Sequence, residues 1–313
     1  MEKIKNVLLV GRENGWEDSP LAKALMLAGV HQARLTVIDV IEGLPSDLRM
    51  LVNAAVHIED LQETAVNYRV EELERLISPI KNTGVRPGVK VLPGKLFVEI
   101  TREVLQSKID LLMVPTIAKR TLRRPLFGSL EMHLIRKCPC PVWLIKPTRR
   151  KKYRRIMAAV DVYENPESTS LSSRIMEIGA SLARMEGSEL HVVHAWELFG
   201  ERTLSGRGGL SRSDVESLAG KVRAEHLDRV TGLVNKYAPE ISSERIHFLK
   251  GDAASIILQV AKREKIELIV MGTVGRTGLT GFLIGNTAET VLQQVDSSVL
   301  AVKPEGFVSP VKL

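Results

Sequence analysis

The sequence predicts two tandem α/β domains, each built on a parallel sheet with helices on both faces. Three observations support this fold class. The chain contains an internal repeat, short apolar segments alternate with segments of helical periodicity, and the short segments are apolar throughout. Strands of that kind are typical of parallel sheets that are buried on both faces. Right-handed crossovers between them give a doubly wound, three-layer sandwich in each half.

The internal repeat sets the domain organisation. A shift of 157 residues aligns residues 94–147 with residues 251–304 without a gap, and twelve of the aligned pairs are identical. Most of the other pairs at strand positions are apolar in both copies, as in IDLLMV and IELIVM. Such self-similarity indicates two copies of one unit. We therefore predict a first domain over 1–147, a basic linker over 148–154, a second domain over 155–304 and a C-terminal tail over 305–313.

The periodicity of apolar residues predicts the elements of each copy in the same order, strand and helix in alternation. In the first copy we expect strands over 4–10, 33–40, 88–92, 109–114 and 141–146, and helices over 20–29, about 46–81, 97–106 and 130–137. In the second copy we expect strands over 154–161, 189–196, 245–250, 266–272 and 297–304, and helices over 172–185, 213–237, 253–264 and 287–295.

Composition excludes several classes of protein. With 44% hydrophobic and 26% charged residues in a chain of 313, the protein can bury two cores. No apolar run approaches the roughly 18 to 20 residues that cross a bilayer, and the first residues lack a signal-peptide pattern, so we expect a cytoplasmic protein without a membrane partner. Cys138 and Cys140 are too close to form a disulfide easily and too few for a metal site.

The formal charge of +7 is concentrated in the segment TRRKKYRR, residues 148–155. Electrostatics alone would let this segment contact nucleic acid, but it has no interleaved aromatic residues and belongs to no recognisable nucleic-acid module. A solvated linker is the favoured interpretation. The segment GERTLSGRGGLSRSD, residues 200–214, follows a predicted strand and is either a lid or an unstructured loop.

A glycine-rich segment, MGTVGRTGLTGFLIGNTAETV over residues 271–291, begins where the fourth strand of the second copy ends. In doubly wound sheets, ligands bind beyond the carboxyl ends of the strands. A phosphate there needs backbone N–H groups, no obstructing side chains and a helix N-terminus nearby, and Asn286 and Thr287 supply capping groups at the expected helix. Taken alone, the segment is either a phosphate-binding loop or a flexible turn.

The spacing Gly272-x2-Gly275-x9-Gly285 resembles the G-x2-G-x9-G-[ST] loop of ATP-binding universal stress proteins. The two copies, the ending VLAVKP and the string GTVGRTG…GNTAE resemble in particular the two-domain universal stress protein E group. This resemblance covers nearly the whole chain. It implies a Rossmann-like, five-stranded parallel sheet of order 3-2-1-4-5 in each domain, and a homodimer that pairs the fifth strands.

The resemblance also implies a set of binding residues in the second copy. The acid that contacts adenine falls on Asp161, a backbone contact falls on Ala195, and Gly272 would lie at the ribose. The remaining positions would surround the phosphates of ATP, with Mg²⁺ as a candidate companion ion: Gly275, Arg276, Gly285, Asn286 and Thr287. One departure is that Asn286 stands where the family has Ser or Thr, so an amide replaces a hydroxyl.

The first copy has lost more of this pattern. The repeat places Pro115 at the position of Gly272 and Ala118 at that of Gly275, while Gly128 is retained. Proline removes an N–H group and alanine adds a Cβ. The position of Asp161 is taken by Gly11 or Arg12, depending on the register. We therefore predict that the first copy is degenerate as a nucleotide site.

The function predicted from the sequence is a stress-response protein that binds an adenine nucleotide in its second domain without catalysis. His191 and His194 point to opposite faces of a strand and make no metal site. No motif unites a nucleophile, a base and an orienting acid. Two alternatives stay open: a scaffold that binds no nucleotide and acts by protein association, and an enzyme on the same fold, such as a slow ATPase with Arg276 as an electrophilic neighbour.

Overall fold

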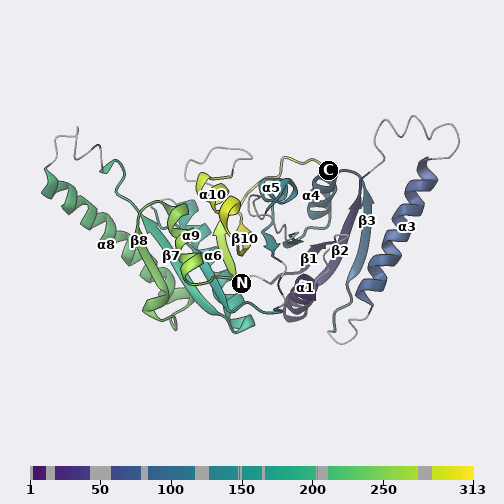
Figure 1. Ribbon diagram of the computed structural model, residues 1–313, viewed down its shortest axis with the longest axis horizontal. Coiled ribbons are helices and arrows are strands. Elements are labelled where there is room, and N and C mark those ends of the chain that lie inside the picture. The colour runs from purple at the N-terminus through teal and green to yellow at the C-terminus, as the bar shows by residue number, and fades with distance from the viewer. Residues whose placement is uncertain are drawn as a thin grey trace. The chain divides into compact units, whose positions relative to one another are not determined.

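Figure 1 shows the computed structural model of the chain, which divides into two compact units. The N-terminal unit comprises Glu2–Lys151 together with Phe307–Leu313, and the C-terminal unit comprises Lys152–Gly306. The structure describes residues 3–11, 18–42, 58–78, 84–116, 127–146, 148, 150–163, 166–201, 203, 211–273 and 284–313.

In the N-terminal unit the strands lie in the order β3-β2-β1-β4-β5, and every neighbouring pair within the unit is parallel. The helices form the connections between consecutive strands. The elements are β1 (Asn6–Val10), α1 (Asp18–His31), β2 (Arg34–Ile41), α3 (Ile58–Ile77), β3 (Gly88–Pro93), α4 (Leu96–Gln106), β4 (Leu111–Pro115), α5 (Ser129–Lys137) and β5 (Val142–Ile145).

The C-terminal unit repeats this arrangement, with parallel strands in the order β8-β7-β6-β9-β10. Its elements are β6 (Arg155–Ala159), α6 (Pro166–Glu186), β7 (Glu189–Trp196), α8 (Arg212–Tyr237), η1 (Ser243–Arg245), β8 (Ile246–Lys250), α9 (Ala253–Arg263), β9 (Leu268–Gly272), α10 (Asn286–Gln294) and β10 (Ser298–Val302). The predicted α/β fold class, with helices around a parallel sheet in each half, is therefore confirmed.

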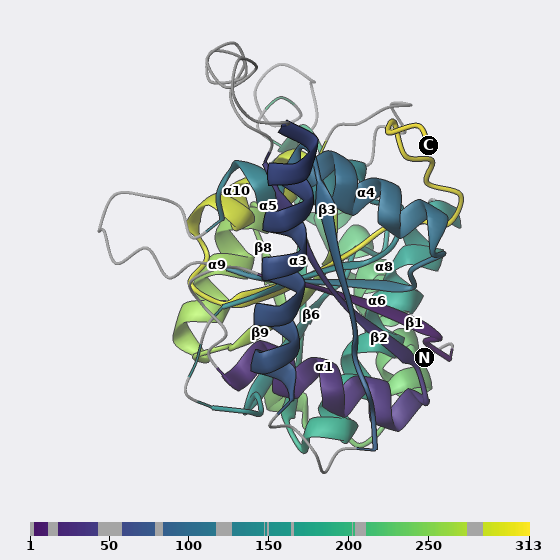
Figure 2. The ribbon, with the colours of Figure 1, turned by 90° about the vertical axis from the view of Figure 1, so that its right-hand side faces the viewer.

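Helices cover both faces of each sheet, as alternate side chains along one strand show. On β7, His194 contacts His226 of α8, whereas His191 lies on the opposite face with His247, which contacts Arg263 of α9. In the N-terminal unit α3 lies along β3, as Figure 2 shows, and α4 packs on α5. Every residue of β4, β5 and β10 is buried, whereas the outer strands β3 and β8 are partly exposed.

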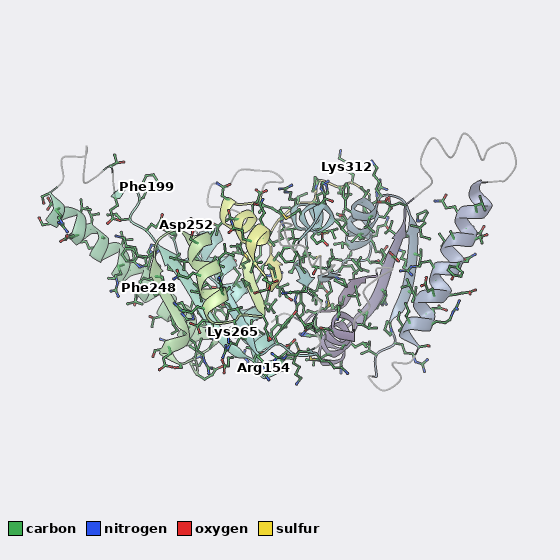
Figure 3. The ribbon with its side chains drawn as sticks, in the orientation of Figure 1. Arg154, Phe199, Phe248, Asp252, Lys265 and Lys312 are labelled. Carbon is green, nitrogen blue, oxygen red and sulfur yellow. The ribbon has the colours of Figure 1, made fainter. Side chains whose placement is uncertain are left out.

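The sequence repeat is also a repeat of backbone conformation. Gly94 and Gly251 have φ of 145° and 138°, and each precedes a helix that follows an outer strand. Lys108 and Lys265, which also match in the repeat, have φ of 48° and 51° at the ends of α4 and α9 (Lys265 is labelled in Figure 3). These identities therefore mark positions where the chain must turn in the left-handed region.

Acidic residues that the sequence places before strands act as backbone caps. The carboxylate of Asp110 accepts hydrogen bonds from the backbone N–H groups of Lys5 and Asn6, at 2.7 and 2.8 Å. The carboxylate of Glu267 accepts the N–H of Arg154 at the matching place in the C-terminal unit. Each carboxylate thus ties the fourth strand of its unit to the start of the first.

Two segments extend what the sequence indicated. The long helical stretch predicted over 46–81 contains α3, and its residues 46–57 and 79–81 lie outside the described part.

Within the basic segment, Tyr153 is already buried in the C-terminal unit, where its N–H donates to Glu186 Oε2 at 2.5 Å. The last seven residues group with the N-terminal unit, and Arg102 Nε of α4 donates to the carbonyl of Lys312.

Candidate functional site

The predicted site residues that the structure describes lie along one edge of the sheet of the C-terminal unit. Strand β6 pairs with both β7 and β9, so the carboxyl ends of these three strands lie side by side. Asp161 follows β6, Ala195 is the penultimate residue of β7 and Gly272 ends β9. Gly285 and Asn286 lie at the start of α10. The strand ends and the helix start are the kind of edge where doubly wound sheets bind ligands.

Asp161 is held at this edge by a serine of α6 that sequence reasoning missed. Ser172 Oγ accepts the backbone N–H of Asp161 at 2.9 Å and donates to its carbonyl at 2.6 Å. One hydroxyl therefore fixes both backbone polar groups of Asp161. The carboxylate of Asp161 also accepts the N–H of Tyr163 in a long contact of 3.5 Å. Position and backbone orientation are thus set by α6.

Gly272 is pressed against α6. A Cβ added at this position would lie 2.8 Å from Leu171 Cδ2 and 3.7 Å from Ile175 Cδ1. The absence of a side chain is therefore required by the packing of the helix on the sheet. It also leaves the backbone of Gly272 without a side chain at the edge where the other predicted residues lie.

Thr273 follows Gly272 and closes the base of the glycine-rich segment. Its carbonyl accepts the N–H of Gly285 at 2.9 Å, which brings the end of β9 to the start of α10. The side chain is 1% exposed, and its Oγ1 has no hydrogen-bond partner among the described residues. Buried hydroxyls are normally paired, so an unpaired one beside a candidate site needs an explanation.

Helix α10 begins without a side-chain cap. Gly285 is its N-cap residue, with φ of −64° and ψ of 146°, and no side chain accepts from the first turn at this cap. The expectation that Asn286 caps the helix is therefore wrong, because Asn286 is already the first helical residue, and its side chain is exposed. Thr287 follows it, half-buried. The first N–H groups of an α-helix have no intrahelical partner and carry the positive end of the dipole.

The other two predicted residues, Gly275 and Arg276, lie outside the described residues, as do the other residues of 274–283. The same holds for residues 202 and 204–210 of the predicted lid or loop. Of the described part of that segment, Gly200 and Glu201 follow β7. Phe199 stands just before them with 96% of its surface exposed (Figure 3).

The corresponding edge of the N-terminal unit keeps the glycine before its last helix, Gly128, and differs at other positions. Pro115 ends β4 where Gly272 ends β9. Gly11 corresponds to Val160, because its N–H donates to the carbonyl of Ile38 on β2 as the N–H of Val160 donates to that of Val193 on β7. This register puts Arg12 at the position of Asp161. Arg12 and Ala118 lie outside the described residues.

At the start of α5, a side chain of the helix itself binds the backbone of the N-cap residue. Glu131, whose counterpart in α10 is Ala288, reaches back so that its Oε2 accepts the N–H of Gly128 at 2.8 Å. Ala288 leaves the matching position of α10 without a carboxylate, although Glu289 stands one residue further along in the first turn of α10. In the N-terminal unit, the negative charge of Glu131 therefore lies at the helix start, which is the place where an anionic ligand would bind.

A buried pair of histidines, His194 and His226, lies next to the end of β6. His194 Nδ1 lies 2.9 Å from the carbonyl of Val160, which only accepts, so this nitrogen carries the proton. His194 Nε2 is hydrogen-bonded to His226 Nδ1, at 3.0 Å, and this bond ties α8 to β7. The N-terminal unit has a buried ion pair at the same place, between Asp39 and Arg69 at 2.6 Å.

Other classes of site are not found among the described residues. No group of three or more His, Cys, Asp or Glu side chains lies close enough to hold a metal ion in that part of the chain. Cys138 and Cys140 are buried free thiols, and burial raises the pKa of Cys140 well above its ordinary value. Within the same described residues, every helix falls short of the length and hydropathy that a membrane span requires.

Comparison with known proteins gives one consistent result. The sequence profile of the universal stress protein family matches residues 10–146 and 152–303. A relative from Haemophilus influenzae, named universal stress protein E homolog, is 26% identical over 309 residues, which is 96% of this chain and 98% of the relative. Universal stress protein E of Escherichia coli K12 is 28% identical over 235 residues, 74% of this chain and 73% of the relative. A solved structure of a functionally unknown protein from Pseudomonas aeruginosa PAO1 is 25% identical, with a TM-score of 0.71, and covers 96% of this chain and 93% of its own.

Proposed function

Because the chain belongs to the universal stress protein family, with one family domain in each half, we propose that its C-terminal domain binds ATP or a related adenine nucleotide. The binding edge is the one formed by the ends of β6, β7 and β9 and by the start of α10. We propose binding without turnover, so that the nucleotide changes the conformation or the partners of the protein. The N-terminal domain binds no nucleotide in this proposal.

The observation that carries the proposal is the start of α10. It has no side-chain cap, and it lies next to the buried hydroxyl of Thr273, which has no hydrogen-bond partner among the described residues. Unpaired N–H groups and a positive helix end attract an anion, and a free hydroxyl donates to one. In the N-terminal domain the corresponding helix start has the carboxylate of Glu131, and the corresponding hydroxyl, that of Thr116, donates to the carbonyl of Ile145.

Each residue of the edge has a role in this proposal. Asp161 would accept a hydrogen bond from the adenine amino group, and the backbone of Ala195 would contact the same ring. The backbone of Gly272, at the end of β9, would lie at the ribose. Thr273, Gly285, Asn286 and Thr287 would surround the phosphates, with Gly275 and Arg276 completing the loop.

Asn286 fits a phosphate in one respect and not in another. Its amide NH₂ is a donor, so it pairs with a phosphate oxygen, but it lacks the hydroxyl with which Ser or Thr serves a phosphate or its magnesium ion. Its exposure at the first position of α10 leaves it free of packing constraints. We therefore expect weaker binding than a serine at this position would give.

Mass spectrometry of nucleotide released from the denatured, purified protein tests the proposal directly. We expect an adenine nucleotide in the extract, or else a rise in melting temperature when Mg-ATP is added to nucleotide-free protein, since a ligand that binds only the folded state stabilises it. Absence of both results would contradict the proposal and favour a scaffold that works without nucleotide.

A pair of matched variants locates the site. Thr273→Val removes a hydroxyl that has no protein partner among the described residues, so it should leave the melting temperature of the nucleotide-free protein nearly unchanged. The shift caused by Mg-ATP should become smaller. Thr116→Val, the matched change in the N-terminal domain, should leave that shift as it is. If both variants behave alike, the phosphate site lies elsewhere.

A further inference from the structure

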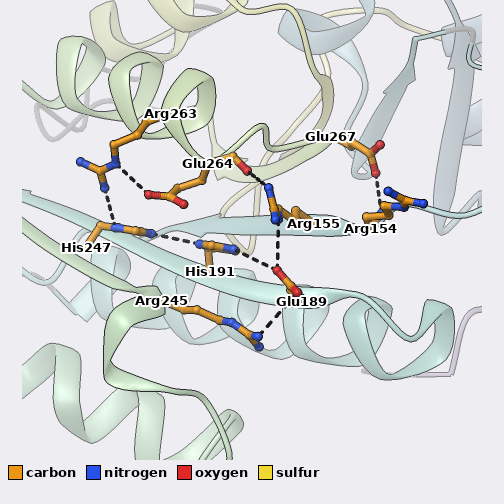
Figure 4. A network of polar contacts seen from close by, with 9 residues as sticks. All are labelled: Arg154, Arg155, Glu189, His191, Arg245, His247, Arg263, Glu264 and Glu267. Atoms are coloured by element: carbon orange, nitrogen blue, oxygen red, sulfur yellow. Dashed lines mark hydrogen bonds and ion pairs between the residues drawn. The ribbon is translucent and has the colours of Figure 1, made fainter.

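Three side chains of the C-terminal domain form a hydrogen-bonded chain on the face of the sheet opposite α8 (Figure 4). Arg263 Nη2 of α9 lies 3.0 Å from His247 Nδ1 of β8, and His247 Nε2 lies 3.0 Å from His191 Nδ1 of β7. The two imidazole rings are stacked, with centroids 5.3 Å apart and planes 3° from parallel. Both histidines are buried, at 4% and 7% exposure. We call these three residues the histidine relay.

The relay fixes the protonation of both rings. A guanidinium only donates hydrogen bonds, so His247 Nδ1 must accept from Arg263 and carries no proton. His247 then holds its proton on Nε2 and donates it to His191 Nδ1. His191 in turn holds its proton on Nε2, which is buried without a hydrogen-bond partner among the described residues. Both rings are therefore neutral, and a second proton on either ring would place two donors face to face.

The charged groups around the relay are already engaged. On the side of His191, Glu189 Oε2 is 4.0 Å from Nε2, but this carboxylate contacts Arg155 at 3.1 Å and Arg245 at 3.6 Å. On the side of His247, Glu264 contacts Arg263 at 2.7 Å, and its carbonyl accepts from Arg155. The charged groups named here are three guanidinium groups, of Arg155, Arg245 and Arg263, and two carboxylates, of Glu189 and Glu264. A histidinium would add to this positive charge.

Burial and charge act together on the pKa values. Burial, followed by the neighbouring His247, lowers the pKa of His191 from 6.5 to about 4, and Glu264 and Glu189 offset only part of this. Burial also lowers the pKa of His247, with Arg263 acting in the same direction and Glu264 opposing it. If α9 moves away and water enters, both rings recover ordinary values near 6.5.

The N-terminal domain has no titrating group of this kind at the matching place. Strand pairing and the sequence repeat align Lys90 of β3 with His247, and Lys90 Nζ contacts the buried carboxylate of Glu103 on α4. Ser107 Oγ also donates to Glu103, at 2.6 Å. Lys90, Glu103 and Ser107 thus stand at this place instead of a histidine pair, so protonation of a histidine does not act on these contacts.

We propose that the histidine relay is an acid-sensitive latch that holds α9 on the sheet of the C-terminal domain and releases it in mild acid, while α4 of the N-terminal domain stays in place. The sign follows from the two protonation states. Neutral rings favour the closed latch, so its stabilisation is complete above pH 6.5 and is lost as the pH falls from 6.5 toward 4. The two domains of one chain therefore respond differently to the same change in pH.

Release of α9 reaches the proposed nucleotide edge through α10. Helix α9 packs on α10, and α10 begins at the residues that would surround the phosphates. A loosened α9 leaves α10 with less support, so nucleotide affinity falls in acid. This step rests on the proposed function, whereas the latch itself depends only on the contacts of the relay.

Amide hydrogen exchange of the full-length protein at pH 7.0 and pH 5.0 tests the latch, with rates corrected for the intrinsic effect of pH. A ring with pKa of about 4 when closed and 6.5 when open raises the opening constant roughly 30-fold at pH 5.0. We expect peptides over α9 to lose protection by about that factor, and peptides over α4 to change little. Equal protection of α9 at both pH values, or an equal loss over α4, would overturn the proposal.

A variant pair separates the relay from other acid effects. His191→Phe keeps a ring against His247 and removes one of the two titrating groups, so the difference between the two pH values over α9 should become clearly smaller. His133→Phe is the control, since His133 of α5 stacks on Phe97 in the N-terminal domain, with centroids 4.4 Å apart. It should leave the response of α9 unchanged. If His191→Phe does not fold, the wild-type comparison of α9 with α4 still decides the question.

Affinity for Mg-ATP at pH 7.0 and pH 5.5 tests the connection to the nucleotide edge. We expect wild type to lose more affinity between these pH values than His191→Phe does, a comparison that cancels titration of the nucleotide itself. No binding at pH 7.0 would contradict the proposed function and leave the exchange result to stand alone. Binding that changes equally in both proteins would contradict the connection through α10.

Discussion

Gly272 shows how one residue answers two demands at once. The loop spacing marks it as a ligand position, but the structure shows that its missing side chain also lets α6 pack on β9, with Leu171 and Ile175 against it. A glycine in such a position is constrained by the fold whether or not a ligand binds. A bulky substitution at Gly272 therefore tests folding as much as binding.

We predict that Gly272→Ala lowers the free energy of unfolding by about 1 kcal/mol and Gly272→Val by roughly 1 to 3 kcal/mol, the usual cost of overfilling a packed core. The added Cβ would lie 2.8 Å from Leu171 Cδ2, so Leu171→Ala should recover part of the loss in the double variant. Urea denaturation of wild type, the two Gly272 variants, Leu171→Ala and the double variant measures this. Additive effects of the two substitutions would show that Leu171 is not the obstacle.

The sequence located some site residues by spacing and missed others that depend on burial. The family resemblance assigned candidate roles to Asp161 and Gly272, and the structure places both residues at the ends of strands. Ser172, which holds the backbone of Asp161, comes from a helix whose packing on the sheet the sequence does not specify. The hydroxyl of Thr273 has the same chemistry as many surface threonines, and only its burial without a partner among the described residues distinguishes it.

At the scale of elements, helices α5 and α10 show why the two copies differ. They match in length and in position within their units, and both follow a glycine. The start of α5 is closed by Glu131, whereas that of α10 has no side-chain cap. The sequence shows both residues, Glu131 and Ala288, but the reach of a glutamate back to the N-cap is a matter of helix geometry.

Substitutions at Asn286 test the start of α10 without disturbing the core, because this side chain is exposed. Asn286→Asp adds a negative charge that suits a helix N-terminus by about 0.3 to 1 kcal/mol but repels a phosphate. We expect unchanged or slightly higher stability and at least tenfold weaker binding of Mg-ATP by calorimetry. Asn286→Ser should bind more tightly than wild type.

Gln293→Glu near the other end of α10 is the matched control for this charge change, since Gln293 is also exposed. It should leave the affinity for Mg-ATP nearly as it is. An equal loss in Asn286→Asp and Gln293→Glu would mean that the net charge of the domain matters, and that the helix start has no special part in binding.

Element order and most element bounds were predictable because apolar periodicity and the repeat agree along the chain. What periodicity does not give is the partner of each polar side chain. The alternation of His191 and His194 predicts opposite faces, and the structure confirms this. Their partners His247 and His226 come from elements far along the chain, so neither pair was visible in the sequence.

At the scale of the whole molecule, the two domains keep one fold and have diverged in polar contacts. The N-terminal domain uses pairs of a basic and an acidic side chain, Asp39 with Arg69 and Lys90 with Glu103, where the C-terminal domain uses histidines. The C-terminal domain therefore has both the uncapped start of α10 and the histidine pair His191 and His247. We infer that binding and its regulation have been concentrated in the C-terminal domain.

Native mass spectrometry of the full-length protein titrated with Mg-ATP tests the central claim most directly, and its mass also reports whether the chain is a homodimer, as the family resemblance implies. We predict that one nucleotide binds per chain at saturation, and that Asn286→Asp greatly reduces this adduct. Two nucleotides per chain would contradict the assignment of the N-terminal domain as a degenerate site. No adduct at millimolar Mg-ATP would contradict nucleotide binding altogether.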